Sequence, residues 1–187
     1  MSEATLDRQI AARVRGLRAE RAMTLEALAE KSGVSRSMIS LIERGETSAT
    51  AVVLEKVAGA LDLSLAALFE MPAVPAGPVS HRADQVAWRD PASGYVRRNV
   101  SPSGFPSPLQ IVEIDFPPGA RVAYEATARQ TPVHHQVWVL DGSIEVTVGE
   151  HSHRLATGDC LAFLLDRPTT YRNRSRKPAR YAVVVAR

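Results

Sequence analysis

Two arginines and three serines fall within ten residues, in a segment whose side chains could read DNA. They are Ser35, Arg36, Ser37, Ser40 and Arg44. An arginine can donate two hydrogen bonds to a guanine edge, which contributes about 1–3 kcal/mol of discrimination between bases. Serine hydroxyls can reach bases or phosphates, and an arginine further along is placed for a phosphate. This chemistry requires the segment to be a helix that enters the major groove.

The surrounding sequence predicts a set of short helices that would hold this segment. Apolar residues recur every three or four positions from Leu6 to Leu17, which is typical of one helical face. Further helices are predicted at 25–31, 36–44, 51–61 and 65–69. Each follows a typical N-cap residue, namely Thr24, Ser35, Thr50 or Ser64. Gly33 and Gly45 permit the sharp turns that end the second and third helices.

The second and third predicted helices, joined by a glycine-containing turn, form a helix-turn-helix. Ile39 and Ile42 are three residues apart and should face the core. Other faces of the third helix are then left for DNA. The candidate DNA-contacting residues are Thr24, Ser35, Arg36, Ser37, Ser40, Leu41 and Arg44.

The pattern is more specific than a generic helix-turn-helix. It reads Leu25-x-x-Leu28-Ala29-x-x-x-Gly33-Val34-Ser35-x-x-x-Ile39-Ser40-x-Ile42-Glu43-Arg44-Gly45. This resembles the XRE (lambda-repressor-like) family, whose members bind double-stranded DNA. The resemblance implies that Arg18 pairs with Glu43 as a structural bridge, so Arg18 is not counted as a DNA contact. Ala49 stands where the family usually has proline, in the loop before the fourth helix.

The positive net charge of the chain does not lie in the part that carries the helix-turn-helix. The chain has 187 residues and a formal net charge of +3. Residues 1–70 hold nine Lys/Arg and ten Asp/Glu, a net of −1, and residues 71–187 hold fourteen and ten, a net of +4. DNA affinity needs local rather than global positive charge. The basic run from Arg172 to Arg180 is therefore interpreted as a solvated loop, with a DNA-backbone patch as the alternative.

Composition excludes several protein classes and divides the chain. With a single cysteine, Cys160, neither an internal disulfide nor a cysteine zinc site is expected. No apolar run approaches the roughly 20 residues of a membrane helix, and the first residues do not form a secretory signal. We therefore expect a cytoplasmic protein without a membrane partner. Three prolines and a glycine in residues 71–80 predict a linker between domains 1–70 and 81–187.

The C-terminal domain has the pattern of a sandwich, jelly roll or barrel. Short alternating runs are separated by turn signals such as Asp141-Gly142 and Gly158-Asp159. Strands are predicted at 85–88, 95–100, 109–116, 121–126, 136–140, 144–148, 152–155, 160–165, 170–173 and 180–186.

Three segments of this domain resemble the cupin family. They are Pro117-Pro-Gly-Ala, His135-Gln-Val-Trp-Val-Leu-Asp-Gly142 and Leu155-x-x-Gly158-Asp159. Metal cupins hold iron, manganese or zinc with three histidines and one glutamate. In this sequence the motif positions for those ligands are Glu125, Thr127, His135 and Thr169, and no other register restores a histidine pair. The usual metal site is therefore not expected, and we predict no metal, cofactor or catalytic residue.

Two reduced metal sites stay open at this point. Glu125, His134 and His135 could form a two-histidine, one-carboxylate triad. His151 and His153 could share one strand face but lack a third ligand.

A barrel without its metal is more plausibly the site of an organic ligand. The family orientation implies the interior residues Glu125, His135, Val137, Thr169 and Tyr171 as candidate ligand contacts. For each of them, the alternative is a polar or apolar residue of the core.

The sequence thus predicts two domains, α then β: a five-helix lambda-repressor-like domain and a cupin jelly-roll barrel. The predicted function is a sequence-specific transcriptional regulator whose degenerate cupin domain senses an unknown small molecule and forms a homodimer. The first alternative is a metal-dependent enzyme of the hydroxypropylphosphonate epoxidase type, whose chemistry needs the iron ligands that are replaced here. A plain DNA-binding module, such as an antitoxin, is the second alternative.

Overall fold

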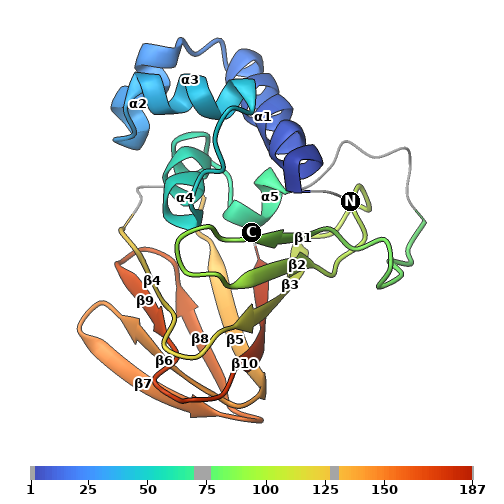
Figure 1. Cartoon of the computed structure of the whole chain (residues 1–187), viewed down its shortest axis with the longest axis vertical. Coiled ribbons are helices and arrows are strands. Elements are labelled where there is room, and N and C mark those ends of the chain that lie inside the picture. The colour runs from blue at the N-terminus through green and yellow to red at the C-terminus, as the bar shows by residue number, and fades with distance from the viewer. Residues whose placement is uncertain (1–2, 70–76, 127–130, 187) are drawn as a thin grey trace.

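The computed structural model describes residues 3–69, 77–126 and 131–186, and it has a helical domain followed by an antiparallel β-domain (Figure 1). The predicted linker falls mostly on residues 71–76, which lie outside the described residues. Within the described part of the chain, no helix has the length and apolarity needed to cross a membrane. The helices are α1 (Glu3–Glu20), α2 (Leu25–Ser32), α3 (Arg36–Arg44), α4 (Ala51–Ala60) and α5 (Leu65–Leu68).

The helix boundaries follow the predicted caps. Thr24, Ser35, Thr50 and Ser64 each accept a hydrogen bond from the backbone N–H three residues later. This satisfies an amide that has no partner within the helix. Gly33 ends α2 at a φ of 66°, and Gly45 ends α3 at 67°, both in the left-handed region that favours glycine. The predicted helices are confirmed.

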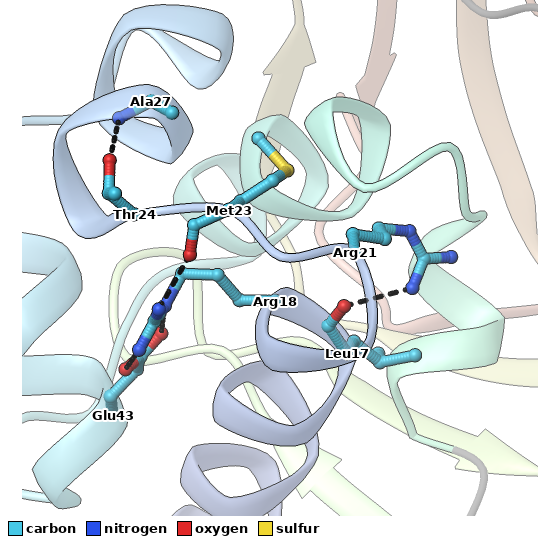
Figure 2. A network of polar contacts seen from close by, with 7 residues as sticks. All are labelled: Leu17, Arg18, Arg21, Met23, Thr24, Ala27 and Glu43. Atoms are coloured by element: carbon cyan, nitrogen blue, oxygen red, sulfur yellow. Dashed lines mark hydrogen bonds and ion pairs between the residues drawn. The ribbon is translucent and has the colours of Figure 1, made fainter.

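One ion pair joins the first and third helices (Figure 2). Nε and Nη2 of Arg18 donate to the two carboxylate oxygens of Glu43 at 2.6 and 2.8 Å. The third nitrogen, Nη1, donates to the carbonyl of Met23 at 2.8 Å. Glu43 is buried and Arg18 is half-buried, so the pair fixes α3 against α1 and the turn that leads to α2. The bridge that the XRE resemblance implied is confirmed.

The β-domain consists of a six-stranded and a four-stranded antiparallel sheet. The six-stranded sheet has the order β1-β2-β3-β10-β5-β8, and the four-stranded sheet has the order β4-β9-β6-β7. All ten predicted strands are present, with ends that differ by a few residues. They are β1 (Ala87–Arg89), β2 (Val96–Asn99), β3 (Leu109–Phe116), β4 (Arg121–Tyr124), β5 (His134–Asp141), β6 (Ser143–Val148), β7 (His151–Ala156), β8 (Cys160–Leu164), β9 (Thr169–Arg172) and β10 (Ala179–Ala186).

Cross-strand register assigns each residue of the central strands to an inner or an outer face. Val112, Val183 and Val137 are aligned across β3, β10 and β5, and all three are buried. The next row, Ile111, Val184 and Gln136, lies on the outer face because successive side chains alternate. The inner faces enclose an apolar core, which gives the predicted cupin jelly roll.

The two domains are in direct contact. Helices α4 and α5 lie against the β-domain (Figure 1), and one apolar cluster runs through both domains. Asp90, in the turn between β1 and β2, is buried and accepts the backbone N–H of Ala51 at 2.8 Å. Further along α4, Nζ of Lys56 lies 2.7 Å from the carboxylate of Glu125. The start of α4 is thus capped by a residue of the β-domain as well as by its own Thr50.

The Asp90 contact predicts a specific effect on stability. In Asp90→Ala, the buried N–H of Ala51 loses its acceptor, and the free energy of unfolding should fall by about 1–3 kcal/mol. Urea unfolding followed by circular dichroism measures this change. Asp84→Ala, at an exposed aspartate six residues earlier, is the control and should change stability by less than about 0.5 kcal/mol. Equal stability of the two variants would contradict a structural role for Asp90.

Candidate functional site

Helix α3 presents polar side chains to solvent and apolar side chains to the core. Ile39 and Ile42 are buried, as predicted. Of the seven candidate DNA-contacting residues, Thr24, Ser35, Arg36, Ser37 and Arg44 are exposed, and Ser40 and Leu41 are half-buried. All seven lie on α3 or at the start of α2 and α3, so the fold brings them together. Their contact with DNA stays a prediction.

The two arginines of this surface are already paired with carboxylates. Nε of Arg36 lies 3.2 Å from the carboxylate of Glu26 on α2, with both side chains exposed. Arg44 pairs with Glu46 at 2.8 Å and donates to the hydroxyl of Ser40. Exposed pairs of this kind contribute little to stability. They can therefore be exchanged for phosphate or base contacts at small cost, and they lower the positive charge that α3 presents to DNA of any sequence.

Two of the predicted contact residues also have a structural role. The hydroxyl oxygens of Thr24 and Ser35 accept the backbone N–H groups of Ala27 and Met38. Because the oxygen of Thr24 is occupied as an acceptor, its hydroxyl proton suits a phosphate oxygen. The hydroxyl of Ser35 also lies 3.2 Å from that of Ser37 and shares a hydrogen bond with it.

A cavity of about 60 Å³ lies between the barrel and the helical domain. This is about four to six times the space that one buried water requires. Its helical wall includes Glu55 of α4 and Ser64, Leu65 and Ala66 at α5. The barrel contributes six polar side chains, namely Tyr95, Arg97, Tyr124, His135, Tyr171 and Tyr181.

Aromatic rings connect this cavity to the helical domain. Phe69, which follows α5, contacts Trp88 with ring centroids 5.3 Å apart, and Trp88 contacts Tyr95 at 6.0 Å. Among the residues that line the cavity, Tyr171 stacks on Tyr181 with ring centroids 5.9 Å apart. Aromatic pairs at these separations stabilise a packed arrangement beyond the area they bury.

The tyrosine hydroxyls of the cavity stay protonated over the ordinary pH range. Burial raises the pKa of Tyr95 to about 12 and raises the pKa of Tyr124, Tyr171 and Tyr181 as well. The hydroxyls of Tyr95 and Tyr124 lie 3.3 Å apart and share a hydrogen bond. The cavity therefore offers neutral hydroxyls that can donate to a bound group.

The predicted ligand-contacting residues divide into two groups. His135 and Tyr171 line the cavity, as expected for a ligand site in the barrel. Val137 and Thr169 are buried but lie outside its lining, since Val137 packs in the core and the Thr169 hydroxyl donates to the carbonyl of Arg167 at 3.2 Å. Glu125 is exposed and faces Lys56 on α4, so it also lies outside the lining. Thr127, at another motif position, lies outside the described residues.

The side chains at the cupin metal positions do not fit a metal. His134 and His135 are neighbours on β5, so His134 points outward while His135 points inward. Glu125 pairs with a lysine, and the hydroxyl of Thr169 is bound to the backbone. His151 and His153 are exposed on β7. In the described residues, no three His, Cys, Asp or Glu side chains are grouped so that they could hold a metal ion.

Sequence reasoning missed Tyr95, Arg97 and Glu55. Tyr95 and Arg97 are two residues apart and share the inner face at β2, which alternation could have indicated. Their strand precedes the recognisable cupin segments, so no motif pointed to them. Glu55 lies in a helix with many apolar residues, and only the contact between the domains makes it a cavity residue.

Comparisons with known proteins agree with this architecture. The chain matches the helix-turn-helix family HTH_3 over residues 14–68 and the cupin domain family Cupin_2 over residues 112–185. The HTH-type transcriptional regulator SutR of Escherichia coli K12 is 30% identical over 172 residues, which cover 90% of this chain and 89% of that protein.

Solved structures include matches over the full length of the chain. An HTH_3 family transcriptional regulator from Vibrio cholerae superposes with a TM-score of 0.80 at 28% identity, over 100% of this chain and 99% of the other. Hydroxypropylphosphonic acid epoxidase from S. wedmorenis reaches a TM-score of 0.48 at 19% identity over the full length of both chains, which is too distant to bear on activity. The chain belongs to the family of helix-turn-helix transcriptional regulators that bind DNA and carry a C-terminal cupin domain.

Proposed function

We propose that this regulator senses a small molecule in the barrel cavity and that occupancy of the cavity changes its binding to DNA. The observation that carries the proposal is the shared wall of the cavity, which α4 and α5 complete on one side and the barrel on the other. A molecule bound there contacts both domains at once. Its binding energy therefore depends on how the two domains are placed.

The helical wall is continuous with the DNA-reading helices. Helix α4 packs on α2, and α5 packs on α1, which the Arg18–Glu43 pair ties to α3. A change in the position of α4 and α5 would therefore move α3 with them.

We infer that α3 inserts its first residues into the major groove. Arg36, at the start of the helix, is the candidate for a guanine edge, and Arg44, at the other end, is the candidate for a phosphate. Thr24, Ser35, Ser37, Ser40 and Leu41 complete the proposed contact surface.

The outer face of the six-stranded sheet is the proposed dimer contact. Leu109, Ile111 and Trp138 are 47%, 40% and 50% exposed, and they lie on the same face of adjacent strands together with Val184. Large apolar side chains grouped on one sheet face are typical of an interface. A second copy fits this face because helix-turn-helix domains read two half-sites about one helical turn apart, which requires two-fold symmetry.

The residues at the cupin metal positions argue against the enzyme alternative. Epoxidase-type chemistry needs iron ligands, and the side chains at the motif positions are engaged in other contacts, such as Glu125 with Lys56. Metal analysis of the purified protein discriminates the two functions, because tightly bound iron in near one-to-one ratio would favour the enzyme.

DNA reading by Arg36 can be tested on operator fragments that the protein selects from genomic DNA. Arg36→Ala should weaken operator binding about 5- to 150-fold, because it removes a bidentate base contact. Arg176→Ala, in the basic loop before β10, is the control and should leave the affinity for operator unchanged. Fluorescence anisotropy at several salt concentrations provides both affinities. Equal losses in the two variants, or strong binding to every sequence, would assign DNA contact to the basic loop.

Sensing can be tested before the effector is identified. We expect a dialysable small-molecule extract of cells to change operator affinity at least fivefold at matched salt, the lower end of typical coupling between sites. Ala66→Phe fills the cavity from its helical wall, and this variant should no longer respond. Identical operator binding with and without extract, in the unchanged protein, would contradict the sensing function.

Dimerisation can be tested by placing a charge on the apolar sheet face. Trp138→Glu should shift the protein from dimer to monomer at micromolar concentration, because a carboxylate would be buried in the contact. Sedimentation velocity measures the change. His151→Glu, exposed on β7 of the other sheet, should remain dimeric. A monomeric unchanged protein, or a dimeric Trp138→Glu variant, would place the contact elsewhere.

A further inference from the structure

The cavity is lined by a buried arginine, two of whose nitrogens have no hydrogen-bond acceptor among the described residues. Arg97 is 7% exposed, and its Nε and Nη2 atoms are buried with no hydrogen-bond partner in the described part of the chain. A buried guanidinium that lacks an acceptor is unfavourable, since desolvation of the ion is not offset. Burial accordingly lowers the pKa of Arg97. Such a side chain points to a partner that the protein does not itself supply.

The edge that Arg97 leaves open is the one that binds carboxylates. Nε and Nη2 point in the same direction and form a planar fork with the spacing of two carboxylate oxygens. The chain uses this same edge elsewhere, because Nε and Nη2 of Arg18 hold the two oxygens of Glu43 at 2.6 and 2.8 Å. In Arg97 these two nitrogens have no acceptor among the described residues, and Arg97 is one of the side chains that line the cavity.

The surroundings restrict the size and the charge of the partner. The volume of about 60 Å³ admits only a few non-hydrogen atoms beyond the charged group. Glu55 lines the same cavity, and its negative charge favours charged Arg97 while it repels a second negative charge on a ligand. The hydroxyls of Tyr95 and Tyr124 are protonated and hydrogen-bond to each other, so one of the two retains a proton to donate to a ligand. A small monoanion fits this arrangement better than a dianion such as sulfate.

We propose that the cavity binds a small monocarboxylate whose two oxygens accept hydrogen bonds from Nε and Nη2 of Arg97. The carboxylate is the effector class of the regulator, and this part of the inference rests on the proposed sensing function.

The position of Arg97 explains how such a ligand would act on the helices. The guanidinium carbon lies 5.4 Å from the ring centre of Phe69, the residue that ends α5. This cation–π contact exists only while α5 is docked on the barrel. A carboxylate that offsets the buried charge of Arg97 stabilises the docked arrangement selectively, which is the differential affinity that a switch requires.

The full-length protein is tested with sodium acetate, propionate and pyruvate, against sodium chloride at equal ionic strength and against sodium sulfate. At about tenfold above Kd, at least one of these carboxylates should raise Tm by roughly 3–6 °C. Arg97→Met should abolish this stabilisation and should itself unfold at a higher Tm than the unchanged protein without ligand, because the unpaired charge is gone. Arg97→Lys keeps the charge without the fork, and it should bind the same carboxylate at least tenfold more weakly by calorimetry.

Arg98→Met is the matched control, since Arg98 is the next residue of β2, faces outward and contacts Glu113. It should retain the full response to carboxylate. The proposal is overturned if no carboxylate of the panel stabilises the unchanged protein, if sulfate stabilises it more, or if Arg97→Lys binds equally well. Carboxylate binding without a change in operator affinity would support the site and contradict the sensing function. An effector response from cell extract that survives in Arg97→Lys and Arg97→Met would support sensing and overturn the site.

Discussion

The docking of α4 and α5 on the β-domain is the contact on which the rest of the arrangement depends. These helices cover apolar and polar groups at one end of the barrel that would otherwise meet water, including rings such as Trp88 and Tyr95. Every polar group covered there is subject to one condition, which is that it needs a hydrogen-bond partner other than bulk water. Asp90 meets the condition by accepting the first amide of α4, and Ser64 meets it by capping α5. Arg97 does not meet it within the described chain, and this makes it informative.

Local features of the fold could be predicted because short-range chemistry determines them. An N-cap such as Ser35 acts on an amide three residues away, and a glycine such as Gly45 acts on its own backbone, so neither depends on the remainder of the chain. Alternation, together with the orientation that the cupin resemblance implies, likewise placed Val137 in the interior, where it is buried. The Arg18–Glu43 pair spans 25 residues, and only the family resemblance made it predictable.

Features that depend on contact between the domains could not be predicted in the same way. The position of Glu125 in the cupin motif suggested an inward side chain, but a lysine of α4 lies 2.7 Å away and holds it at the domain boundary. Arg97 and Arg98 are chemically identical neighbours in the sequence. One is buried against Phe69 and the other pairs with Glu113, because they point to opposite faces of β2 and only one face is covered by α5.

Charge is distributed so that the helical domain presents little net positive charge. Its net charge is −1, and the arginines at both ends of α3 are each paired with a glutamate. Non-specific binding depends on the counterions that basic side chains release from DNA. We therefore propose that recognition depends on base contacts and, in the proposed dimer, on the spacing of two α3 helices. A regulator of this kind is sensitive to small changes in helix placement. In the function that we propose, a carboxylate bound at Arg97 beside α5 changes operator binding by shifting α4 and α5, and α3 with them.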